Sequence, residues 1–218
     1  MPFLPFSERA KSWERIALEL RRFAQLRNGE ASDPEILADK VGLHLVDAHS
    51  AVHDFSAADR EHLMVTMSHA WSGGVLPKAL PNGKYICILN PNHLRRRNRI
   101  TLMEEVVHIY RRHTPTGLCE LLPGLRVRDY DKNQEAEAYG VGAAVLLPWS
   151  RFFGEINAGK SVYELSEAFD VTDALIEYRI KVTGATNLYR DRIARMGAKR
   201  EAMSVSASED SLSERELG

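Results

Sequence analysis

The segment at about residues 133–147 constrains the fold most, because beyond its first turns it is a helix with almost no polar surface. From Gly140 it runs GVGAAVLL until Pro148 ends it. A helix that is apolar on all sides is buried inside the protein. Gly140 and Gly142, with the two alanines that follow, allow another helix to pack closely. We therefore expect this helix to lie in the interior, against another helix.

The remaining elements follow from hydrophobic periodicity and from cap and turn residues. Helices are expected at residues 8–26, 34–41, 57–70, 101–112, 133–147, 161–182 (two helices around 169–172) and 187–195, and strands at 43–46 and 84–89. Residues 64–67 also fit a strand. The Gly- and Pro-rich residues 71–82 are expected to form a loop, and residues 123–131 are expected to be irregular.

These elements predict an α+β fold, a small sheet with several helices. The expected organisation is an N-terminal helix in residues 1–32, a core in residues 33–160 and a C-terminal helical segment in residues 161–196 packed on that core. Residues 197–218 are rich in Ser and Glu and have almost no apolar content. A disordered tail is therefore expected there.

The composition is that of an ordinary globular protein, with 44% hydrophobic and 27% charged residues and a net charge of -1. No global electrostatic field points to nucleic acid or membranes. The two cysteines, Cys87 and Cys119, do not suggest a disulfide framework. No stretch approaches the roughly 18 apolar residues of a membrane helix. We expect a cytoplasmic protein with no membrane partner.

One short motif points to metal chemistry. Glu104 and His108 are four residues apart, so a helix places them on the same face. Glu105 lies beside them, rotated by about a hundred degrees. This is the geometry of H-E-x-x-H, in which two histidines bind zinc and the glutamate takes a proton from water. Here Glu104 replaces the first histidine. The same residues are also typical of a solvated helix face.

Glu135 opens the apolar helix and allows two interpretations. An acidic residue at the start of a buried helix suits the helix dipole. Alternatively, Glu135 points at the neighbouring helix and is a third metal ligand.

The chain resembles the ImmA/IrrE family of metallopeptidases. In that family a strand ending in N-P leads through an R-x-R-F-like turn into T-L-x-H-E-x-x-H. A later helix reads E-x-x-A-N-x-x-A-x-x-L-L-x-P. The matching stretches are Asn90-Pro91, residues 97–108 (RNRITLMEEVVH) and residues 135–148 (EAEAYGVGAAVLLP). The resemblance covers about residues 34–182. In this chain Tyr139 stands where the family usually has Asn.

The resemblance implies a zincin-like metallopeptidase core that binds Zn²⁺, with Glu105 as the general base and His108 and Glu135 as ligands. It also implies an endopeptidase that cleaves a helix-turn-helix transcriptional repressor and switches on stress, defence or mobile-element genes. Glu104 would complete the ligand set. Two carboxylates and one neutral imidazole fully offset a divalent ion, so the metal becomes a weaker Lewis acid. The set also suits manganese or iron. The alternative function is a weak or inactive metal-binding regulator that binds a repressor without cleaving it.

Cys87 is a further candidate ligand. Strand alternation places it opposite Ile86 and Ile88, on a face that is expected to look onto the metal helix. A thiolate there would close the site and silence the enzyme. The other interpretation is a buried structural cysteine. His113 either assists an oxyanion or offsets the C-terminal helix dipole, and the second interpretation is preferred. Tyr130 and Tyr139 are alternative donors to an oxyanion, and the sequence does not choose between them.

A basic run precedes the motif and consists of Arg95, Arg96, Arg97 and Arg99. Such a run is usually a solvated surface, but it is also a candidate site for nucleic acid as an activator. Residues 162–172 resemble the first part of a helix-turn-helix. The helix that follows, at 173–182, has few basic residues, which favours a structural role over DNA binding. A DNA-binding regulator is the third alternative.

Overall fold

The protein is described by a computed structural model that covers residues 4–27 and 29–198. In chain order, its elements are α1 (Glu8–Phe23), α2 (Pro34–Val41), β1 (Leu43–Val46), α3 (Ala48–Ala51), α4 (Ala57–Glu61), the π-helical turn η1 (His62–Thr66), β2 (Gly73–Ala79), β3 (Tyr85–Leu89), α5 (Arg95–Arg111), β4 (Gly117–Leu122), β5 (Leu125–Asp129), α6 (Lys132–Leu146), α7 (Trp149–Asn157), α8 (Val162–Phe169) and α9 (Asp173–Val182).

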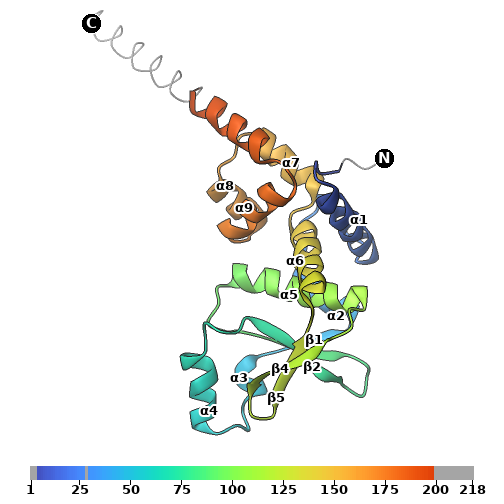
Figure 1. Ribbon diagram of the computed structural model, residues 1–218, viewed down its shortest axis with the longest axis vertical. Coiled ribbons are helices and arrows are strands. Elements are labelled where there is room, and N and C mark those ends of the chain that lie inside the picture. Colours follow the sequence, from blue (N-terminus) through green and yellow to red (C-terminus); the bar gives the residue numbers. More distant parts are fainter. Residues whose placement is uncertain (1–3, 28, 199–218) are drawn as a thin grey trace, which may run out of the picture.

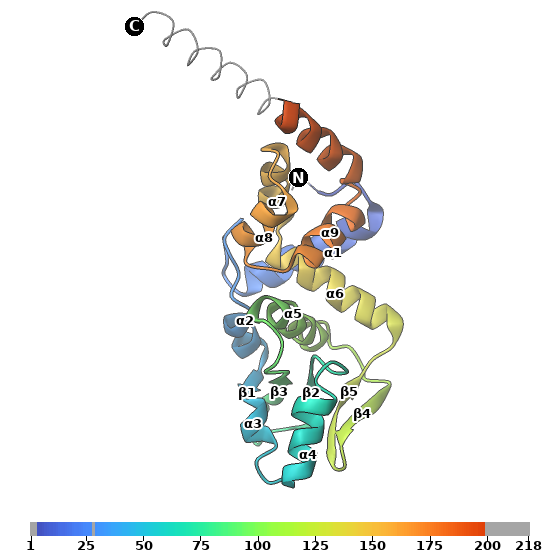
Figure 2. The ribbon, with the colours of Figure 1, turned by 90° about the vertical axis from the view of Figure 1, so that its left-hand side faces the viewer.

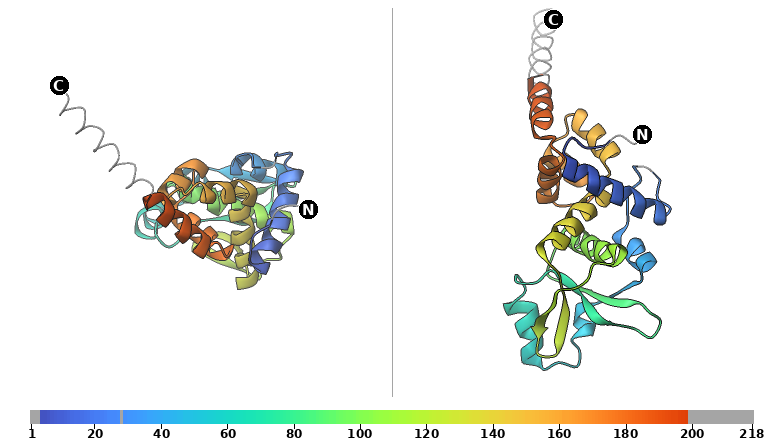
Figure 3. Two further views of the ribbon diagram at one scale, coloured as in Figure 1. Left: turned by 90° about the horizontal axis from the view of Figure 1, so that it is seen from above. Right: turned by 45° about the vertical axis from the view of Figure 1, so that its right-hand side comes forward.

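The elements form three successive levels (Figures 1 and 2). The strands lie at one end with α3 and α4. Helices α2, α5 and α6 form the middle level, and α1 with α7, α8 and α9 forms the other end. The right-hand view of Figure 3 shows α1 and the C-terminal helices on one side of α6 and the strands on the other. The mixed α+β fold class is therefore confirmed.

The sheet has the strand order β1-β3-β2, with β1 parallel and β2 antiparallel to the central β3. Strands β4 and β5 form a separate antiparallel hairpin. Both faces of β3 are covered, since Cys87 belongs to the core beneath the helices and Ile88 to a second core on the far side. Ile86 and Ile88 do face away from Cys87, but neither face of this strand is open.

The prediction of a loop at residues 71–82 is wrong, because Gly73–Ala79 form strand β2. A Cβ on Gly74 would lie 2.7 Å from the Cβ of Val127, so glycine allows the hairpin to approach the sheet. Pro77 lies in the stretch where the pairing of β2 with β3 is shifted. The Gly and Pro that suggested a loop thus serve close packing and an irregular ladder.

The prediction of an irregular segment at residues 123–131 is also wrong. Leu125–Asp129 form β5, which pairs with β4. Within it Leu125 and Val127 are buried, and Arg126 between them is exposed. This alternation is the pattern of a half-buried strand, but in five residues it is a weak signal.

Several helix boundaries also differ from the prediction. Helix α5 begins at Arg95, six residues before the predicted start at 101, so the basic run forms its first turns. Residues 57–66 are helical as expected, ending in a π-helical turn, and residues 64–67 do not form a strand. Helix α1 ends at Phe23, three residues early. Helices α3 and α7 were not predicted.

The buried apolar helix is confirmed as α6. A Cβ on Gly140 would lie 2.3 Å from the ring of Trp13 in α1. On another face, a Cβ on Gly142 would lie 3.2 Å from the Cβ of Met103 in α5. Because glycine lacks this atom, α6 packs closely against two helices, and this packing brings its first turn beside α5.

Buried arginines donate hydrogen bonds to the backbone carbonyl groups at the C-terminal end of α6. Arg21 of α1 donates to the Val145 carbonyl oxygen at 3.0 Å, and Arg179 of α9 donates to the Leu147 carbonyl oxygen at 3.3 Å. Arg179 also forms an ion pair with Glu14 of α1, which accepts a hydrogen bond from the Trp149 backbone at 2.8 Å. Cations at this end suit the helix dipole and its unpaired carbonyls. Because Arg179 is fully buried, it is not free to contact DNA.

A further helix, at residues 186–198, follows α9 in the chain. It contacts the end of α7, where Arg192 Nε donates a hydrogen bond to Asn157 Oδ1 at 3.1 Å. It contains the helix expected at 187–195. Of the expected disordered tail, residues 199–218 lie outside the described part. No helix in the described residues is long and apolar enough to cross a membrane. The domain boundaries and the helix-turn-helix character of α8 and α9 stay predictions.

Candidate metal centre and active site

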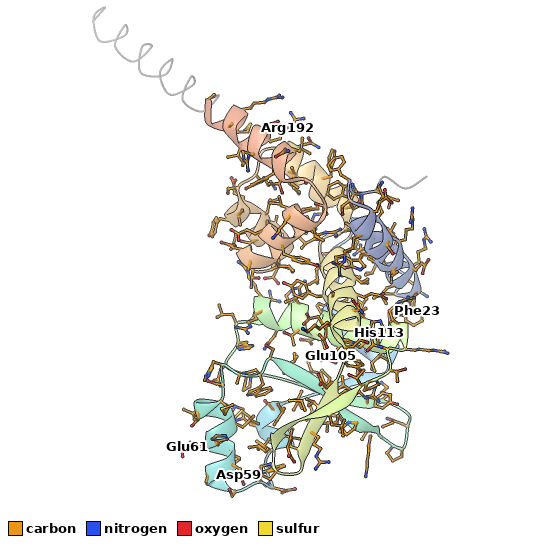
Figure 4. The ribbon with its side chains drawn as sticks, viewed as in Figure 1. Phe23, Asp59, Glu61, Glu105, His113 and Arg192 are labelled. Carbon is orange, nitrogen blue, oxygen red and sulfur yellow. The ribbon has the colours of Figure 1, made fainter. Side chains whose placement is uncertain are left out.

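The candidate residues meet where α5 lies against the first turns of α6. Helix α5 supplies Glu104, Glu105 and His108, and α6 supplies Glu135. His108 Nε2 lies 3.6 Å from Glu135 Oε1. Figure 4 shows Glu105 and His113 near this junction, above the strands. The structure thus brings His108 and Glu135 together from two helices, as their interpretation as ligands requires.

Glu104 and Glu105 lie in a poorly solvated place, whereas the Glu135 side chain is about half exposed. The pKa of Glu104 is raised to about 8, mainly by burial and then by the charges of Glu105 and Glu135. The pKa of Glu105 is also raised to about 8, by burial and by Glu135, although Arg128 opposes the rise. Burial likewise raises the pKa of Glu135. At pH 7 Glu104 and Glu105 are therefore mostly protonated in the metal-free protein.

His108 is held as a neutral imidazole. Its residue is 2% exposed, and burial, followed by the neighbouring His113, lowers its pKa to about 3. Its Nδ1 lies 3.0 Å from His113 Nδ1, and its ring stacks on Tyr130 with centroids 3.7 Å apart. The neutral form is the one that binds metals, and Nε2 is the ring nitrogen that faces Glu135.

His113 has a role that the sequence interpretation missed. Arg112 at the C-cap of α5 has φ 56°, which turns the chain back, and His113 N then donates to the His108 carbonyl at 2.9 Å. His113 Nε2 lies 3.5 Å from Glu137, which pairs with Arg111. Partners of this kind fix the orientation and tautomer of a ligating histidine. A five-residue spacing gave no such signal, since it places His113 on another face of a straight helix.

The structure separates the two tyrosines. The Tyr130 hydroxyl is buried close to Arg128, and burial raises its pKa, as do the charges of Glu105 and Glu135. Tyr139 instead packs edge-on against Tyr178, with ring centroids 4.6 Å apart. Tyr130 is therefore the better placed of the two to donate a hydrogen bond beside His108.

The carboxylates and the neutral imidazole of this site are groups that bind divalent cations. One Glu105 oxygen, Oε2, is buried without a hydrogen-bond partner among the described residues, and the pKa values of Glu104, Glu105 and Glu135 are all raised. A bound cation would stabilise the ionised forms of these glutamates. Within residues 4–27 and 29–198, however, no three His, Cys, Asp or Glu side chains form a group that could hold a metal as they stand. His108 and Glu135 are in position, and further ligands would have to adjust.

Cys87 lies in β3 and is fully buried. Burial, followed by the charge of Glu105, raises the pKa of its thiol well above the ordinary value. The thiol is therefore protonated, whereas a metal ligand must be a thiolate. Cys87 does face the metal helix, and ligation by Cys87 stays a prediction.

The basic run is largely neutralised by acidic partners. Arg95 and Arg96 pair with Asp170 at the end of α8, Arg96 also pairs with Glu167 at 2.6 Å, and Arg99 lies 3.6 Å from Asp170. Arg97 instead donates to Ser72 at 3.3 Å. The run thus joins α5 to α8, and its role toward nucleic acid stays a prediction.

In zinc metallopeptidases a helix with H-E-x-x-H lies beside a second element that supplies a glutamate, and the E-E-x-x-H helix with Glu135 resembles this arrangement. The profile of the Peptidase M78 family, described as the IrrE N-terminal-like domain, matches residues 59–181, more than half of the 218-residue chain. The chain therefore belongs to this family, which confirms the resemblance to ImmA/IrrE metallopeptidases and implies a divalent metal, usually zinc. No curated protein and no solved structure matches the chain significantly.

The pKa values predict how the metal-free protein responds to pH. Glu104 and Glu105 have folded-state pKa values of about 8, above those of the unfolded chain, so the folded state binds more protons between pH 4.5 and 8. Stability must then fall as pH rises through this window. His108 has the opposite effect only below about pH 6.5. Urea unfolding with a chelator present should therefore show decreasing stability from pH 6.5 to 8.

The control for this prediction is the Glu104→Gln, Glu105→Gln double variant, whose side chains do not titrate. It should show a flatter pH dependence over the same range. A wild-type stability that rises from pH 6.5 to 8 would contradict the crowded arrangement of carboxylates.

Proposed function

We propose that the protein is a zinc-dependent endopeptidase that acts in the cytoplasm and cleaves a helix-turn-helix transcriptional repressor. This cleavage would switch on stress, defence or mobile-element genes. Family membership supports peptidase chemistry. The observation on which the proposal depends most is the meeting of His108 Nε2 and Glu135 Oε1, at 3.6 Å, beside the unpartnered carboxylate of Glu105.

In this proposal Glu104, His108 and Glu135 would hold the ion. When bound, zinc would supply a Lewis acid for water and for a peptide carbonyl. His113, with its contact at His108 Nδ1, keeps Nε2 of His108 free to act as the ligand. Binding of a cation would also lower the pKa values of the glutamates, because opposite charge favours their ionised form.

Glu105 is proposed as the general base. Once ionised, its Oε2 accepts a proton from the attacking water, and the resulting acid returns that proton to the leaving amide nitrogen. Burial of this oxygen keeps bulk water from competing for it. The Tyr130 hydroxyl, which is buried beside His108 and Arg128, is proposed to donate to the oxygen that becomes negative as the carbonyl is attacked.

The second candidate is a regulator that binds a repressor without cutting it. Two observations favour it: Glu104 stands in place of a ligating histidine, and the described residues contain no preformed three-ligand group. An added carboxylate makes the bound ion a weaker Lewis acid, so the enzyme is expected to be slow in any case.

Replacing Glu104 by His separates the two candidates. If the protein is an enzyme, Glu104→His should keep about one bound metal and raise the rate of repressor cleavage, because one negative charge leaves the site. The measurement is metal content by elemental analysis, together with cleavage of the repressor encoded by the neighbouring gene, followed by mass spectrometry. The matched control is Glu61→His on α4, which should leave both unchanged. Metal binding without cleavage in both wild type and Glu104→His would support the regulator instead.

Two further parts of the proposal concern the regulation of the enzyme, and each requires a present interaction to be broken. Nucleic acid would activate the enzyme by drawing Arg95, Arg96 and Arg99 away from Asp170, since these ion pairs now hold the basic run. Cys87 would silence it by binding the ion as a thiolate, which requires the buried thiol to lose its proton.

A further inference from the structure

A hollow lies directly beside the candidate metal centre. It has a volume of about 310 Å³, and His108 and His113 form part of its wall. Arg112, from the end of α5, and Arg128, from β5, also line it. No carboxylate is among its lining residues. The hollow is therefore a positively charged pocket that shares a wall with the site of the proposed reaction.

The two arginines of this pocket lack acidic partners. Elsewhere on α5, Arg95, Arg96 and Arg111 each form an ion pair. Within the part of the chain that the structure describes, neither Arg112 nor Arg128 forms an ion pair. The Arg128 guanidinium lies 3.9 Å from the centre of the Tyr85 ring, which holds it in place. Its charge also lowers the pKa of Glu105, with which it forms no ion pair in the described residues.

The backbone at Arg112 gives an independent indication. Its φ of 56° is in the left-handed region, where a helix C-cap usually has glycine. A side chain with a Cβ is rarely found in this conformation, so its presence suggests a use for that side chain. The same turn directs His113 back onto His108 and places Arg112 in the wall of the pocket.

We propose that this pocket binds a carboxylate of the peptide substrate close to the scissile bond, with Arg112 and Arg128 as its ligands. The inference depends on the proposed peptidase function and names its substrate class: peptides with an acidic residue, or a free C-terminus, near the cleaved bond. Guanidinium groups suit carboxylates because their planar donors match both oxygens.

The experiment measures binding, which needs no catalysis. Metal-free, isotope-labelled protein is titrated in NMR experiments with short Ala/Ser peptides that carry one central Glu or one central Gln and a C-terminal amide. A third peptide has Gln and a free C-terminal carboxylate. The Glu peptide, the free-carboxylate peptide or both should bind at least tenfold more tightly than the Gln amide, with shifts at the Arg112 and Arg128 side chains. The preferred peptide identifies the source of the carboxylate.

Two variants locate the binding. Arg112→Gly should lower the affinity for the preferred peptide about tenfold without loss of stability, because glycine suits the left-handed conformation better. Gln25→Gly is the matched control: Gln25 has φ 63° just beyond α1, so this change relieves the same backbone strain away from the pocket. It should leave affinity unchanged. Arg128→Gln should also lower affinity about tenfold.

The outcomes separate the inference from the proposed function. Equal binding of all three peptides, no binding of any, or unchanged affinity in Arg112→Gly and Arg128→Gln would overturn the carboxylate pocket. Carboxylate-selective binding that both variants weaken supports the pocket even if the metal-loaded protein cleaves nothing. In that case the peptidase proposal fails and the pocket stands.

Discussion

Replacing Glu105 by Gln is expected to lower peptide cleavage by about 10²–10⁴-fold, the usual contribution of a general base. The amide has the shape of the carboxylic acid but cannot accept a proton from water. The fold should be kept, because the pKa of Glu105 is about 8 and the group is already mostly neutral at pH 7 in the metal-free protein. The measurement is the cleavage rate at saturating metal, with metal content checked in the same samples.

The matched control is Glu61→Gln. Glu61 is an exposed residue of α4, and Figure 4 shows it far from Glu105. This isosteric change should leave the rate as it is in the wild type. Wild-type cleavage by the Glu105→Gln variant would show that another group is the base. Loss of metal by that variant would show that Glu105 is a ligand instead.

The second large effect is expected at the buried pair of Glu14 and Arg179. Arg179→Met should lower the free energy of unfolding by about 3–5 kcal/mol, the usual cost of removing one partner of a buried ion pair. The change leaves the Glu14 charge unpaired and removes donors from the Leu147 carbonyl at the end of α6. Both residues are almost fully buried, so solvent does not compensate for the loss. Urea unfolding measures the effect.

The double variant Glu14→Gln, Arg179→Met distinguishes a lost charge pair from lost packing. The amide oxygen introduced by Glu14→Gln would still accept the hydrogen bond from the Trp149 backbone, and the new side chain has no charge to bury. Much of the stability lost in Arg179→Met should therefore return. If the double variant is less stable than the single one, packing of the Arg179 side chain dominates over the unpaired charge.

The sequence predicted best those features that depend on local geometry. The apolar run after Gly140 predicted a buried helix with close helix neighbours, and Gly140 and Gly142 do contact α1 and α5. Strand β1 was predicted with its bounds, because Gly42 stops α2 in a left-handed conformation. Strand β2 was missed, because Gly74 is explained only by the hairpin packed against it and Pro77 only by the shifted pairing of β2 with β3.

By itself the sequence determined that Glu104 and His108 share one helix face, because a four-residue spacing fixes this in any helix. It left open whether Glu135 faces them. Only the tertiary structure decided that, because the packing of α6 against α5 sets which residues of two separate helices meet. The contact of His113 with His108, the unpaired Arg112 and the burial of Arg179 were likewise decided by chain reversal and packing. Such relations join residues far apart in sequence or beyond a helix end, where no periodicity extends.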